Sequence, residues 1–325
     1  MRRREFIALA SSAVAAWPCG ARAQHSEKVY RVGILEPIPE NENSANLDAL
    51  RTGLRQVGYI EGRNLAIDYR SADGRAERFA ALAAELVRRK VDVIVTRGTP
   101  AVLAARQATG TIPVVMAAMG APFLVVDSLA RPGGNITGMT TFSTELIGKR
   151  IELLKELVPN LSRLALIHNI GNPMSPPEWG ETKAAARALG LRVVLLDVRS
   201  EPDIRQAFAT AVRQHVDALL IGADGLTQAY QRTIVELAAR NRLPAAHPSR
   251  DFVEIGGLVA YAVNYPGLYF RVASFIAKIF RGARPAELPV EQPTRFELVI
   301  NLTTAKALGI TIPQSVLART DEAIE

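Results

Sequence analysis

Apolar and polar positions along the chain follow two alternating patterns. Short apolar runs rich in β-branched residues, such as VYRVGIL at 29–35 and VDVIVT at 91–96, are typical of buried strands. Between these runs lie helix-length segments with apolar residues three or four positions apart, as at 44–59. Strands separated by helices favour parallel pairing through right-handed crossovers, with helices on both faces of the sheet. The pattern therefore predicts a doubly wound α/β fold.

The alternation occurs twice along the chain. A first unit ends near residue 141, and a long amphipathic segment at 143–159 opens a second unit of similar size. No Gly- or Ser-rich linker separates the two, which favours short hinge segments over a flexible tether. We expect two Rossmann-like lobes joined by a hinge that the chain crosses more than once: lobe 1 at 24–141 plus about 262–287, lobe 2 at 142–261, and a returning segment at 288–325 that we assign to neither lobe.

The first 23 residues have the layout of a secretory signal. Three arginines at positions 2–4 precede an apolar run at 6–17, and Ala21-Arg22-Ala23 fits a small-residue cleavage pattern. The adjacent arginines also fit the twin-arginine export pattern. Ala16-Trp17-Pro18 is a poor lipoprotein-processing sequence before Cys19, so we expect cleavage near Ala23 and a periplasmic protein without a lipid anchor.

The net charge and the cysteine content exclude two further classes of function. Removal of residues 1–23 takes away four arginines and one glutamate, which lowers the net charge from +7 to +4. This mild excess is spread along the chain and predicts no nucleic-acid partner. The same cleavage removes Cys19, the chain's one cysteine, and excludes disulfide and thiol chemistry from the mature protein.

Motifs for catalysis, nucleotides or metals are missing from the sequence. There is no Gly-x-Ser-x-Gly elbow, no Walker loop, no HExxH helix and no CxxC pair, and the four histidines lack metal-ligand spacing. The Gly-rich stretch SLARPGGNITGMT at 128–140 is interpreted as a turn, anchored by Arg131, followed by the last strand of the first lobe. We therefore expect no catalytic residues, no cofactor and no metal.

A ligand site is expected where the carboxyl ends of the strands of both lobes meet, because open α/β sheets bind ligands there. In the first lobe, VDVIVTRGTPAVLAARQ at 91–107 predicts Thr99 as a helix N-cap and Pro100 as the first helical residue, a combination that suits an anion. In the second lobe, Asp224 follows a strand and suits a cationic group. The candidate ligand-facing residues are Glu36, Thr96, Arg97, Gly98, Thr99, Ala118, Met119, Asn169, Asp224 and His247. Candidate hinge residues are Gly138, Thr140 and Tyr261.

Several long stretches also carry a resemblance to a known family. These include LRQVGYIEGRNLAIDYRSADG, SLARPGGNITG, ELLKELVPNLSRLALIHN and LPVEQPTRFELVINLTTAKALGITIP. With them the chain resembles the ABC transporter substrate-binding proteins of the tryptophan/tyrosine-binding type, from the signal to the C-terminus. The chain departs from that family at Ala121, where relatives commonly have an aspartate.

The resemblance implies a type I periplasmic binding protein, monomeric, whose lobes close on a small ligand and deliver it to a membrane permease with its ATPase. The expected ligand bears a carboxylate and belongs to the amino acids or aromatic compounds. Three alternatives stay open: a sensing subunit for a receptor, a small-molecule α/β enzyme with a converging nucleophile, base or metal, and a ligand-responsive gene regulator. The signal and the lack of a helix-turn-helix before the first strand disfavour the regulator.

Overall fold

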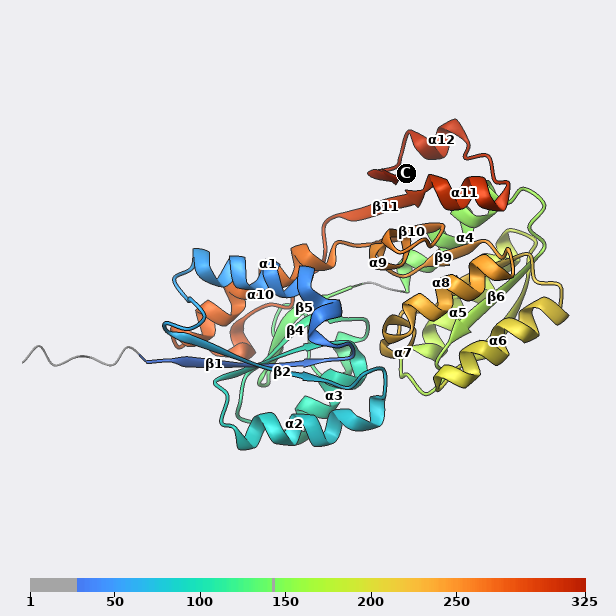
Figure 1. The fold of residues 1–325 in the computed structure, drawn as a ribbon. Helices are drawn as coiled ribbons and strands as arrows, with labels where there is room; N and C mark the ends of the chain where they lie inside the picture. The colour runs from blue at the N-terminus through green and yellow to red at the C-terminus, as the bar shows by residue number, and fades with distance from the viewer. Residues whose placement is uncertain (1–27, 142–143) are drawn as a thin grey trace, which may run out of the picture.

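The computed structural model describes residues 28–141 and 144–325, which form two α/β lobes side by side (Figure 1). The predicted signal peptide lies outside the described residues. Within them, no helix is both long enough and apolar enough to cross a bilayer. The two lobes confirm the fold class predicted from the sequence.

The first lobe is built on a five-stranded parallel sheet in the order β2-β1-β3-β4-β5. The apolar runs of the sequence form its strands, and the last three of them along the chain are buried along their whole length. The strands are β1 (Tyr30–Glu36), β2 (Leu65–Ser71), β3 (Val93–Arg97), β4 (Val114–Met119) and β5 (Ile136–Thr140).

Helices cover both faces of this sheet. The helices α1 (Ser44–Gln56) and α10 (Tyr265–Phe280) pack against each other and bury one face. The opposite face is covered by α2 (Phe79–Arg88) and α3 (Thr99–Ala108). Helix α10 comes from late in the chain, and its buried side chains share one core with those of α1. The first lobe is therefore completed by a segment that returns from the second.

The second lobe contains a seven-stranded sheet in the order β12-β11-β10-β9-β8-β6-β7. All neighbouring strands are parallel except β10 and β11, which run antiparallel. The strands are β6 (Arg163–His168), β7 (Arg192–Asp197), β8 (Ala218–Ile221), β9 (Ala245–His247), β10 (Val259–Val263), β11 (Phe296–Asn301) and β12 (Glu322–Ile324). The returning segment thus supplies two strands to this sheet.

Two layers of helices enclose the second sheet. One apolar core lies under α4 (Glu145–Leu157), α5 (Ser175–Ala188) and α11 (Leu302–Leu308), and another lies under α6 (Glu201–Arg213) and α8 (Gln231–Arg240). Three shorter helices are α7 (Gly225–Ala229), α9 (Arg250–Glu254) and α12 (Gln314–Leu317). The sequence pattern predicts one helix at 226–242; the structure divides it into α7 and α8, because the φ of −107° and ψ of 26° at Tyr230 interrupt the helical backbone.

The chain passes between the lobes three times, after β5, after β10 and before β11. Two of the proposed hinge residues, Gly138 and Thr140, lie in β5, where Gly138 O accepts from Glu291 N and Thr140 N donates to Glu291 O, on the returning segment before β11. Tyr261 lies inside β10 opposite Leu298. All three residues therefore precede the crossing points, and their part in a hinge motion stays a prediction.

The Gly-rich stretch at 128–140 forms a turn and a strand, as its sequence predicts. The Ser128 hydroxyl accepts a hydrogen bond from Arg131 N at 3.0 Å, and Asp127 N donates to Pro132 O at 3.0 Å. The side chain of Arg131 is exposed. The Ser128 hydroxyl also donates to Arg131 O at 3.2 Å, so Arg131 anchors the turn, as predicted, through its backbone N–H and C=O.

Candidate functional site

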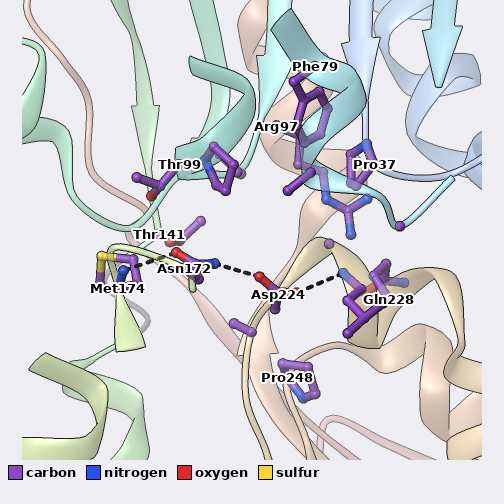
Figure 2. Close-up of a pocket in the computed structure, with 18 of the residues that line it drawn as sticks. Pro37, Phe79, Arg97, Thr99, Thr141, Asn172, Met174, Asp224, Gln228 and Pro248 are labelled. Atoms are coloured by element: carbon purple, nitrogen blue, oxygen red, sulfur yellow. Dashed lines mark hydrogen bonds between the residues drawn. The ribbon is translucent and has the colours of Figure 1, made fainter. Parts of the chain in front are cut away.

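A cleft lies where the carboxyl ends of the two sheets face each other. It encloses a cavity of about 80 Å³, while a single water needs about 10–15 Å³, so a small organic molecule fits. Both lobes line it (Figure 2): Pro37, Gly74, Ala76, Phe79, Arg97, Gly98, Thr99, Pro100, Ala118 and Thr141 from the first lobe; Asn172, Met174, Ala223, Asp224, Gly225, Leu226, Gln228 and Pro248 from the second; and Tyr265 at the crossover between them.

Arg97 is the positive charge of this cleft. It ends β3 with only 6 % of its surface exposed, and its guanidinium Cζ lies 4.5 Å from the centre of the Tyr265 ring. Its Nη1 has no hydrogen-bond partner among the described residues. Burial opposes the charge, but neighbouring groups that include Glu36 outweigh it and hold the pKa of Arg97 above its usual range. A buried guanidinium with a free donor is well suited to a carboxylate.

Next to Arg97, helix α3 begins with its amino end at the cleft. Gly98 is the N-cap, with a φ of 84°, and its N–H donates to Ala118 O at 2.8 Å. The prediction that Thr99 caps this helix was wrong, because the helix begins one residue earlier than expected and Thr99 is its first residue. The Thr99 hydroxyl is buried without a partner, and the first turn of any helix leaves N–H groups free. This end of the cleft therefore offers several donors to an anion.

Asp224 brings the negative charge from the other lobe. It caps α7, where its Oδ1 accepts from Leu226 N at 2.8 Å, and its Oδ2 accepts from Asn172 Nδ2 at 2.7 Å. Asn169 Nδ2 also reaches Oδ1, at 3.3 Å. Figure 2 shows Arg97 and Asp224 pointing into the cleft from opposite sides. Among the described residues that line the cleft, Arg97 is the only basic and Asp224 the only acidic side chain.

The remaining walls are mostly apolar. Phe79 lies on the first-lobe side, and Met174 and Leu226 lie on the second-lobe side. Sequence reasoning did not select these three, nor Gln228 and Tyr265. Phe79 is the first residue of α2, where an apolar side chain at helical spacing is interpreted as core, whereas the aromatic character of the segment around Tyr265 is visible in the sequence.

The structure brings five of the ten predicted ligand-facing residues to the cleft: Arg97, Gly98, Thr99, Ala118 and Asp224. Asn169 supports Asp224 from behind without lining the cavity. Glu36 and Thr96 lie beneath it, both fully buried.

Met119 and His247 lie elsewhere and were wrongly placed at the cleft. Met119 packs in the core under α2 and α3, since successive residues of a strand point to opposite faces. The His247 ring stacks on Phe252 with 4.9 Å between ring centres and faces a separate cavity of lobe 2. Burial lowers the pKa of His247 to about 3, so it is a neutral core residue.

No group of three or more His, Cys, Asp or Glu side chains suited to a metal occurs in residues 28–141 and 144–325. The buried pair of His168 and Glu178, with 2.7 Å between Nε2 and Oε2, does not line the cleft. Ala121, the departure from the family pattern, does not line it either.

Comparisons with known proteins find relatives that cover most of the chain. The chain is 27% identical over 291 residues to the tyrosine-binding protein of Clostridioides difficile, with 88% of this chain and 82% of that protein covered. Among solved structures it is similar to an ABC domain from Streptococcus pneumonia in complex with L-Trp, at 28% identity and a TM-score of 0.83, and to a conserved domain protein from Vibrio cholerae, at 28% identity and a TM-score of 0.85. Both cover 91% of this chain and 100% of the other.

The model of the ABC transporter substrate binding protein family matches residues 31–324. This is a family of binding proteins, which confirms the expectation of a binding protein and not an enzyme. The fold is that of the type I periplasmic binding proteins. The chain therefore belongs to the ABC transporter substrate binding protein family.

Proposed function

We propose that this protein is the periplasmic solute-binding component of an ABC importer and that it binds a zwitterionic amino acid in the cleft between its lobes. The observation that carries this proposal is the pair of opposite charges, Arg97 on one lobe and Asp224 on the other. An α-amino acid presents one carboxylate and one ammonium group, so it satisfies both charges at once.

The carboxylate is assigned to the first lobe. There the free Nη1 of Arg97, the unpartnered Thr99 hydroxyl and the amino end of α3 all supply donors. The ammonium group is assigned to Asp224, whose carboxylate is held in place by Asn172 and by the α7 backbone. A ligand bridging the two lobes stabilises the closed arrangement, which the permease and its ATPase would then recognise.

The side-chain end of the ligand is assigned to the apolar walls. Phe79, Met174 and Leu226 suit an apolar or aromatic group. Two relatives support this class: one is named a tyrosine-binding protein, and another was crystallised with L-Trp. We therefore propose tyrosine and tryptophan as the first ligands to test.

The test begins with a thermal-shift screen of the amino acids against the mature protein, because a ligand that binds the folded state raises the melting temperature. Calorimetry then compares Arg97→Met with Arg106→Met for the ligand found. Arg106 is the matched control, since it is exposed on α3 and its Nη1 donates to Leu124 O.

Loss of a charge-assisted hydrogen bond costs about 1.5–3 kcal/mol, so Arg97→Met should raise Kd by roughly tenfold to more than a hundredfold. Arg106→Met should leave Kd within about twofold, as surface substitutions usually do. A screen without any amino-acid hit, or equal effects of the two substitutions, would contradict the proposal.

A further inference from the structure

A buried carboxyl group lies directly behind the anion-binding end of the cleft. Glu36 ends β1 and has no exposed surface. Its Oε1 accepts a hydrogen bond from the Tyr269 hydroxyl, and its Oε2 has no partner among the described residues. Glu36 does not line the cleft, but its carboxyl interacts electrostatically with Arg97, which does. Arg97 therefore has two possible counter-ions: the Glu36 carboxyl buried behind it and a ligand carboxylate in the cleft.

The groups that face Glu36 come from three elements. Arg97 lies on β3, Tyr69 on β2 and Tyr269 on α10, and all three interact electrostatically with the carboxyl. The hydroxyl of Tyr69 is occupied: it donates to Ile38 O at 2.7 Å and accepts from Asn43 at 3.2 Å. Arg97 is the one cation in this set. Burial raises the pKa of Glu36 to about 7, in spite of the opposing effects of Arg97 and of the Tyr269 hydrogen bond.

A ligand carboxylate changes this balance in one direction. It brings a second negative charge to Arg97, close to Glu36, and it displaces water from the cleft above. Both changes disfavour an ionised Glu36, the first by like-charge repulsion and the second by further desolvation. Protonation of Glu36 removes that repulsion, and the ligand carboxylate then no longer shares the positive charge of Arg97 with a second anion.

Resting on the proposed function, we infer that binding of a carboxylate at Arg97 draws a proton from solvent onto the ionised fraction of Glu36, so that ligand binding is coupled to proton binding. Glu36 is thus a positioning residue that sets the preference of the cleft for anions. A protonated Glu36 favours an anionic ligand, and an ionised Glu36 competes with it. The affinity for a carboxylate then falls as the pH rises above neutrality.

Two measurements test this inference: the titration midpoint of the Glu36 carboxyl, and the affinity for L-tyrosine as a function of pH. In ¹³C NMR of protein labelled at the glutamate side-chain carboxyl, the midpoint of Glu36, assigned with Glu36→Gln, should rise by at least about one pH unit on saturation with L-tyrosine. Between about pH 7 and 8, calorimetry should show Kd for L-tyrosine rising by up to tenfold per pH unit. Both charges of free L-tyrosine persist over this range, because its own carboxylate raises the pKa of its ammonium group above that of a peptide N-terminus.

Glu36→Gln keeps the size of the side chain and its acceptor for Tyr269, and it should abolish the pH dependence of Kd. Glu297→Gln is the matched control, because Glu297 is a largely buried carboxyl whose pKa is also raised by burial, and it lies outside the cleft. This substitution should leave the pH dependence intact. A flat Kd in the wild type, or a slope that survives in Glu36→Gln, would overturn the inference.

Failure of the proposed function gives a different result. If no amino acid binds, the same NMR titration is repeated with concentrated acetate, the simplest carboxylate that can reach Arg97. A raised Glu36 midpoint with acetate would then support the coupling without the amino-acid ligand, and an unchanged midpoint with both acetate and L-tyrosine would refute it.

Discussion

Glu36 also predicts how the stability of the ligand-free protein depends on pH. In the folded state burial raises the pKa of Glu36 from 4.5 to about 7. A carboxyl with a raised pKa binds its proton more tightly in the folded state than in the unfolded chain. Its contribution to stability is therefore complete below pH 4.5 and is lost as the pH rises through 7.

Replacement of Glu36 by glutamine keeps the side chain neutral at every pH. A shift of this size corresponds to about 3 kcal/mol at about pH 8. Glu36→Gln should thus exceed the wild type in free energy of unfolding by that amount at about pH 8, and the two proteins should be nearly equal at about pH 4. The substitution also removes a possible counter-ion of Arg97. The attraction between Arg97 and ionised Glu36 is already included in the raised pKa of Glu36, so it adds no separate cost.

Chemical denaturation at a series of pH values measures this difference directly. Denaturation midpoints and slopes should be recorded for both proteins in the same buffers, because a change in slope would mean that the unfolded state differs. A variant less stable than the wild type at about pH 8, or a difference that does not vary with pH, would refute the reasoning.

Two further predictions concern packing and titration away from the ligand. Gly138→Ala should destabilise the protein by more than about 2 kcal/mol in thermal denaturation, because its Cβ would lie 2.2 Å from Met116 O and the φ of Gly138 is 128°. Gly134→Ala is the control: it has open space around it and should change the stability by less than about 0.5 kcal/mol. Equal effects of the two substitutions would contradict this prediction. In NMR titration His247 should stay neutral at every pH above about 4. The pKa of His168 should lie above 6.5, because the attraction of Glu178 for the protonated ring outweighs the effect of burial. A lower pKa for His168 than for His247 would contradict this prediction.

The fold was predictable because its signals are local. Apolar runs such as 91–96 and the helical spacing between them fix strands and helices, and the rule for parallel crossovers then fixes two doubly wound lobes. Arg97 and Asp224 were found for the same reason, since each stands at or just after the end of a strand that the topology directs to the cleft. The break at Tyr230 had no such local signal.

Side-chain direction was the part that sequence reasoning missed. Glu36, Thr96 and Met119 stand at the same strand ends as the cleft residues, but a strand alternates its faces and sends each of them to the core. A register error of one residue is enough to exchange the two faces. The buried partners of Glu36 come from residues far apart in the chain, so the contact with Tyr269 could not be read from the sequence.

Calorimetric titration with L-tyrosine and with its two truncated analogues tests the central claim most directly. Tyramine lacks the carboxylate that Arg97 is proposed to bind, and 3-(4-hydroxyphenyl)propionate lacks the ammonium group proposed for Asp224. If the cleft recognises both charges of an amino acid, each analogue should bind at least about tenfold more weakly than L-tyrosine. An analogue that binds as tightly as L-tyrosine, or a failure of L-tyrosine and L-tryptophan to bind at all, would contradict it.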